Sequence, residues 1–213
     1  MTSVKKEMKR LGKYPEPLDP ISLHNFYTLY VLEFFAASVG IRGVTTPYLG
    51  LDEVDKETGF AVLTEKTIRP VWLPPKMVMQ MELYHDYLRA YARTRPLPKG
   101  PDGRPAPCFL LDDRENTLLV TPTVKTEYLR RNAQFNYAAS IFRRFIRNEL
   151  RESGCPGQVA EAWLSHASRG EEIYHKYSQF SLGAYRQALQ YYLVPILDDL
   201  RFDPWGPPTC LPR

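Results

Sequence analysis

The stretch that most constrains the fold is residues 21–40, ISLHNFYTLYVLEFFAASVG. Large apolar residues recur in it at intervals of three and four positions over more than three turns. Such spacing places side chains on one face of an α-helix, so it predicts a long buried helix that ends near Gly40. Its apolar positions are Leu23, Phe26, Tyr27, Tyr30, Val31, Phe34 and Phe35.

The rest of the chain predicts further helices and one short hairpin. The segments GFAVLTE and RPVWLP have the composition of two strands, joined by a turn around Lys66 and Thr67. Pro, Gly and Ser mark the ends of the helices that follow. These helices are expected at 76–93, from 121 onward, at 133–153, 156–164 and 181–200, the last with a kink at Pro195. The predicted class is mainly α with a small β-hairpin.

Residues 21–200 are expected to form one domain, because a chain of 213 residues that is 44% hydrophobic can bury one sizeable core. Residues 1–20 read as a basic leader that ends in a linker, KYPEPLDP. The segment 96–107, PLPKGPDGRPAP, predicts an exposed loop, and residues 201–213 predict an irregular Pro-rich tail.

Composition excludes several classes of protein. The three cysteines are widely spaced and predict neither a disulfide framework nor a zinc site, which suits a reducing cytosol. The N-terminus lacks the apolar region of a signal peptide, and no apolar run is long enough to span a membrane. A net charge of +4 permits a nucleic-acid partner without requiring one.

Positive charge is concentrated in residues 125–151. On the helix expected there, polar residues recur three and four apart as a stripe. A solvated basic face is the simpler interpretation of this stripe, although such a zone also attracts phosphate groups. The stripe consists of Ser140, Arg143, Arg147 and Arg151, and the zone adds Lys125, Arg130, Arg131 and Arg144.

Five other residues suggest chemistry, and each has a plain structural alternative. Arg42 follows the first helix and can complement the negative end of its dipole. Lys66 fits an ordinary turn, and His166 fits a capping or core position after a short helix. Tyr174 and Tyr177 have apolar neighbours and can serve as packing groups. None of these residues indicates a function by itself.

Taken in order, these segments resemble the catalytic domain of the tyrosine recombinases, the phage-integrase-like family, over about residues 21–195. SVGIRGV resembles the segment written T-G-x-R, and AVLTEKTIRPVWLP resembles the hairpin that presents a catalytic lysine. SIFRRF resembles the H-x-x-R box, and WLSH resembles the L-G-H box. EEIYHKYS resembles the segment that carries the nucleophilic tyrosine.

The resemblance implies a site-specific DNA recombinase that cuts and rejoins strands through a 3′-phosphotyrosyl intermediate. Arg42 and Arg143 would hold the scissile phosphate, and Lys66 would protonate the leaving oxygen. His166 would bind the phosphate or assist proton transfer, and Tyr174 would be the nucleophile. No metal and no cofactor is implied. The implied partners are double-stranded DNA and a homotetramer on two duplexes, with no membrane, in the bacterial cytoplasm at the nucleoid.

Several positions depart from the family pattern. Ser140 stands where the H-x-x-R box has His, and a serine cannot carry charge or act as a base near neutral pH. Val39 replaces the usual Thr, and Ser165 replaces the usual Gly. The expected nucleophile is one residue nearer His166 than is common, which makes Tyr177 the alternative nucleophile.

Two alternatives remain for the function. A catalytically weakened relative could act as a DNA-binding or recombination-accessory protein, and Ser140 favours that reading. A plain helical interaction domain would make the matches accidental. Family members also carry a separate DNA-binding domain before the catalytic domain, so the linker-like KYPEPLDP suggests that this chain is a catalytic fragment.

Overall fold

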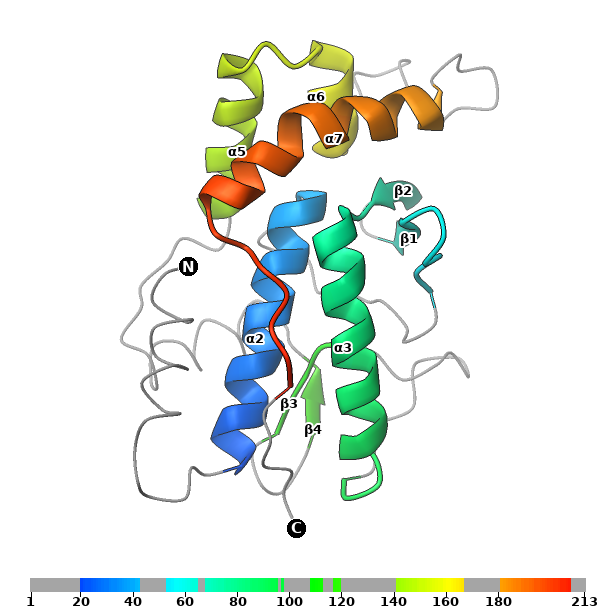
Figure 1. Cartoon of the computed structure of the whole chain (residues 1–213), viewed down its shortest axis with the longest axis vertical. Coiled ribbons are helices and arrows are strands. Elements are labelled where there is room, and N and C mark those ends of the chain that lie inside the picture. Colours follow the sequence, from blue (N-terminus) through cyan, green and yellow to red (C-terminus); the bar gives the residue numbers. More distant parts are fainter. Residues whose placement is uncertain are drawn as a thin grey trace.

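The structure is a computed structural model that describes residues 20–42, 53–64, 68–95, 97, 108–112, 117–119, 141–166 and 181–207. The described chain is mainly helical with two short antiparallel hairpins, which confirms the predicted class. Two helices, α2 and α3, run side by side, and α5, α6 and α7 form a layer across one end of this pair (Figure 1). The helices are α2 (Pro20–Val39), α3 (Pro75–Tyr91), α5 (Ile141–Glu152), α6 (Gly157–Trp163) and α7 (Leu182–Asp199).

Helix α2 is the centre of the molecule. Its sequence predicted one apolar face, but the helix is buried on nearly all sides between α3, the second hairpin, α5 and α7. A helix surrounded in this way must bury polar side chains as well, and each of those needs a hydrogen-bond partner. His24, Asn25 and Thr28 on α2 are buried and all form hydrogen bonds.

The predicted hairpin is present as β1 (Phe60–Thr64) and β2 (Ile68–Trp72). Phe60 pairs with Trp72 at one end of the hairpin, and Thr64 pairs with Ile68 at the other. A second hairpin, β3 (Leu110–Asp112) and β4 (Thr117–Leu119), was not predicted. It packs on α2 at the end far from α7 (Figure 1).

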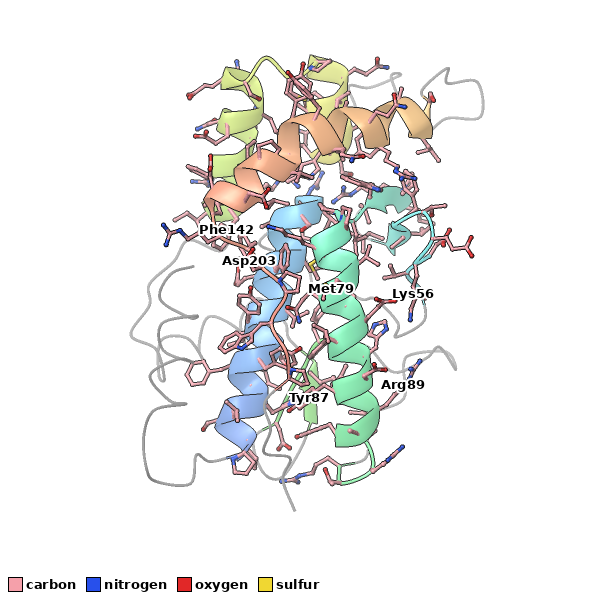
Figure 2. The ribbon with its side chains drawn as sticks, viewed as in Figure 1. Lys56, Met79, Tyr87, Arg89, Phe142 and Asp203 are labelled. Carbon is pink, nitrogen blue, oxygen red and sulfur yellow. The ribbon has the colours of Figure 1, made fainter. Side chains whose placement is uncertain are left out.

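Residues 201–207 have no regular secondary structure, as the sequence predicted, and run along α2 and α3 (Figure 1). Phe202 is fully buried and stacks on Phe34 with ring centroids 4.9 Å apart. The amide of Trp205 donates to Gln80 at 2.6 Å, and Gln80 donates to the carbonyl of Trp205 at 3.2 Å. Asp203, labelled in Figure 2, lies 3.1 Å from the ammonium group of Lys76. This part of the tail therefore belongs to the core of its own chain.

Candidate functional site

Three residues selected from the sequence lie together in the structure. Arg42 follows the C-terminal end of α2, Arg143 lies in the first turn of α5, and His166 follows α6. Arg143 Nη2 is 3.1 Å from His166 Nε2. Arg42 Nη2 donates a hydrogen bond of 3.2 Å to the carbonyl of Ser165, next to the histidine. Two guanidinium groups and an imidazole thus meet where the ends of α2 and α6 approach α5.

Direct packing between the ends of α2 and α6 makes Arg42 and His166 neighbours. Gly40 ends α2 with a φ of 65°, in the left-handed region that glycine adopts readily. A Cβ at this position would lie 3.0 Å from atoms of the Trp163 ring on α6. Trp163 Nε1 also donates a 2.9 Å hydrogen bond to the carbonyl of Ser38. Gly40, the first glycine of SVGIRGV, is therefore required for a close approach between two segments of the site.

The end of α6 folds back in a Schellman motif, which fixes the position of His166. The amide of Ser165 donates to the carbonyl of Ala162 at 3.0 Å, and the amide of His166 donates to the carbonyl of Glu161 at 2.9 Å. Ser165 has a φ of 53°, which favours glycine. Serine therefore keeps this turn at a cost of about 1 kcal/mol. A glycine at position 165 would adopt this turn without that cost.

Arg143 joins the two helix ends. Its Nη1 donates to the carbonyl of Gly40, and its Nη2 donates to the carbonyl of Leu164. Carbonyl groups at helix C-termini lack partners within the helix and carry its partial negative charge, so a guanidinium is favourable there. Arg143 therefore fixes the segments of Arg42 and His166 relative to α5.

Arg69 on β2 also supports this site, and the sequence analysis missed it. Its side chain is 1% exposed, with Nη1 donating to the carbonyl of Trp163 at 3.0 Å and Nη2 donating to the carbonyl of Val39 at 2.9 Å. A buried guanidinium is tolerated because its donors are satisfied. The signal in the sequence was alternation, since Arg69 shares the inward face of its strand with the buried Val71.

The hairpin that carries Lys66 is attached to the site through Arg69. Lys66 itself lies between β1 and β2 in the sequence, outside the described residues. Ser140, one residue before α5, and both candidate nucleophiles, Tyr174 and Tyr177, also lie outside them. Their roles remain predictions.

His166 has a perturbed proton affinity. Its pKa is lowered from the usual value, first because partial burial disfavours the charged ring and then because the Arg143 charge is close. Arg42 acts in the same direction, whereas the Glu161 carboxylate, 3.1 Å from Nδ1, partly offsets both arginines. The imidazole is therefore predominantly neutral at neutral pH.

This arrangement suits a phosphate group. Two guanidinium groups supply permanent positive charge and planar donors for oxyanions, and a neutral imidazole beside them can accept a proton. On α5, Arg144 and Arg151 are exposed and extend the positive surface away from the cluster.

Within the part of the chain that the structure describes, no group of three or more His, Cys, Asp or Glu side chains could hold a metal ion. None of the described helices combines the length and apolar character needed to cross a membrane.

Comparisons with known proteins give a distant likeness. No protein-family model matches the chain, and no curated protein matches it significantly. One similar solved structure is described as the crystal structure of XerA recombinase, with 15% sequence identity and a TM-score of 0.49. The match covers 88% of this chain and 63% of that chain, so this chain spans less than two thirds of the length of the solved structure. We base the function on the site and not on this likeness.

Proposed function

We propose that the chain is the catalytic part of a tyrosine-type DNA strand transferase, a site-specific recombinase. The convergence of Arg42, Arg143 and His166 supports this proposal most strongly. These residues come from three separate segments, whose order in the sequence resembles that of the tyrosine-recombinase motifs. Their helix ends contact one another through Gly40, Trp163 and the guanidinium of Arg143. A solvated basic helix face would not require that contact.

In the proposed reaction, Arg42 and Arg143 neutralise the charge that develops on the scissile phosphate. The Tyr174 oxygen attacks phosphorus, an O–P bond forms, and the bond from phosphorus to the 5′-oxygen breaks. The tyrosine proton passes to Nε2 of His166, and the leaving 5′-oxygen takes a proton from the ammonium group of Lys66. The 3′-phosphotyrosyl link retains the bond energy, so a 5′-hydroxyl of another strand can reverse the step and complete recombination.

The proposed substrate is double-stranded DNA, held by four copies of the chain on two duplexes. The exposed arginines of α5 suit this partner, because phosphate contacts supply most of the affinity for a nucleic acid. DNA binding by this chain should therefore weaken steeply as salt concentration rises.

A suicide DNA substrate, nicked so that the 5′-leaving fragment diffuses away, tests the proposal. Wild-type protein with its own DNA site should accumulate a covalent protein–DNA adduct, and mass spectrometry should place the nucleotide on Tyr174. Tyr174→Phe should bind DNA and form no adduct, whereas Tyr177→Phe should still form one. An adduct on Tyr177 would move the nucleophile within the same proposal. DNA binding with no adduct on either tyrosine would favour the weakened, DNA-binding relative instead.

A further inference from the structure

Glu161 makes two separate contacts with His166. The Schellman turn at the end of α6 brings the histidine back to the glutamate, so the amide of His166 donates to the Glu161 carbonyl at 2.9 Å. The same turn sets the two side chains together, with Nδ1 of the imidazole 3.1 Å from Oε2 of the carboxylate. His166 and Glu161 are therefore joined by both a backbone contact and a side-chain contact.

The partners of the two ring nitrogens define the tautomer of His166. A guanidinium can only donate hydrogen bonds, and an ionised carboxylate can only accept them. Arg143 Nη2 faces Nε2 at 3.1 Å, and Glu161 faces Nδ1. The neutral ring therefore carries its proton on Nδ1 and has its lone pair on Nε2, on the side of the arginine cluster.

We infer that Glu161 is a positioning residue for His166, which holds the ring with Nδ1 protonated and directs Nε2 toward the reacting phosphate. This inference rests on the proposed function. When a phosphate oxygen replaces Nε2 as the acceptor for Arg143, the lone pair becomes available for the tyrosine proton. Nε2 then takes that proton, and the negative charge of Glu161 stabilises the imidazolium that forms.

The influence of Glu161 on the pKa of His166 depends on the other charges around the ring. Arg143 from α5 and Arg42 after α2 oppose protonation of the ring, and Glu161 from α6 favours it. The side chains of His166 and Glu161 are 44% and 45% exposed, so water screens their attraction. Glu161 therefore raises the pKa of His166 only modestly against the two arginines.

A nuclear magnetic resonance titration of His166 in the free protein tests the pair without any DNA. Glu161→Gln retains an acceptor oxygen and removes the charge, so the pKa of His166 should fall by about half a unit. Glu152→Gln removes the same charge at the C-terminal end of α5 and serves as the matched control, with an expected shift near zero. An unchanged pKa of His166 in Glu161→Gln would overturn the inference.

The pH dependence of adduct formation on the suicide substrate then tests the role in the reaction. In Glu161→Gln the acidic limb of the rate profile should move to lower pH by the shift measured in the titration. Glu161→Ala also removes the acceptor that orients the ring, so its rate on the pH plateau should fall about tenfold, with most of that loss restored in Glu161→Gln. A titration shift with an unmoved rate profile would contradict the positioning role. Absence of any adduct from wild-type protein would instead defeat the proposed function, while the titration would still decide whether the pair exists.

Discussion

Two histidines show how differently the two regions of this molecule use polar side chains. His24 lies in the α2–α3 region, is fully buried, and has both ring nitrogens bonded at 3.0 Å, one to Tyr87 Oη and one to the carbonyl of Leu110. Tyr87 projects from α3 toward α2 (Figure 2). His166 lies beside the α5–α6–α7 layer with 44% of its side chain exposed, and its partners are charged groups near the surface.

The surroundings of the two histidines extend this contrast. Near His24, the buried Asp112 accepts from Tyr91, pairs with Arg95 at 3.3 Å and exchanges 2.7 Å hydrogen bonds with Asn25. Each group has a complementary partner within the protein. Near His166, Arg42 donates to the carbonyl of Ser165, and Arg143 donates to the carbonyls of Gly40 and Leu164. In the first region side chains bond to one another and join the elements, whereas in the second region two guanidinium groups bond to the carbonyls at helix ends.

The largest expected effect comes from the residue that connects the hairpin to the site. Arg69→Met should lower the free energy of unfolding by about 3 kcal/mol, because two buried carbonyls lose charged donors. Arg144→Met removes an exposed arginine from α5 and should cost about 0.5 kcal/mol or less. Urea denaturation measures both. A small, equal loss in the two variants would show that Arg69 does not hold the ends of α2 and α6.

The second expected effect is a loss of folding stability at low pH that arises from His24 in the α2–α3 region. Burial lowers the pKa of His24 from 6.5 to about 4. As the pH falls, His24 therefore takes up a proton near pH 6.5 in the unfolded chain but only near pH 4 in the folded chain. Stability is therefore complete above pH 6.5 and falls as the pH decreases through this window, by about 2.5 kcal/mol at pH 4.5. Urea denaturation at pH 7 and pH 4.5 measures the loss. The loss should be clearly smaller in His24→Gln, and an unchanged loss would contradict this account of His24.

The smallest effect isolates the contact between Gly40 and Trp163. Gly40→Ala adds a Cβ that would lie 3.0 Å from the indole ring at a φ of 65°, so we expect a loss of about 2 kcal/mol in unfolding free energy. Gly154 has a similar φ of 80° and open space around its Cβ position, so Gly154→Ala should lose only about 1 kcal/mol. Thermal or urea denaturation gives the difference. Equal losses would mean that α6 moves freely away from α2.

Much of the fold could be predicted from the sequence because its elements have strong local signals. The buried helix α2, the β1–β2 hairpin and the start of α7 near Ser181 were all predicted correctly. The β3–β4 hairpin was missed because each strand has three residues, too few for an alternating pattern to be recognised. Local patterns also do not show which side chains meet across the fold.

The candidate site was predicted only in part, for the same physical reason. Arg42, Arg143 and His166 were selected through the order of their segments, and the structure brings them together. Arg69 and Glu161 were not selected, since their contacts with the ends of α2 and α6 arise only in the folded chain. An arginine on the inward face of a strand was the one usable signal, and Glu161 resembles an ordinary helix residue.

The most direct test of the central claim compares two neighbouring arginines of α5. Arg143 lies in the cluster, and Arg144 is exposed beside it. With the suicide DNA substrate under single-turnover conditions, Arg143→Lys should form the covalent adduct at least about 100-fold more slowly, because a point charge does not replace a planar guanidinium at a phosphate. Arg144→Lys should stay within about twofold of wild type, since it keeps the charge at an exposed position. Equal rates in the two variants would contradict the claim that Arg42, Arg143 and His166 form the phosphate site.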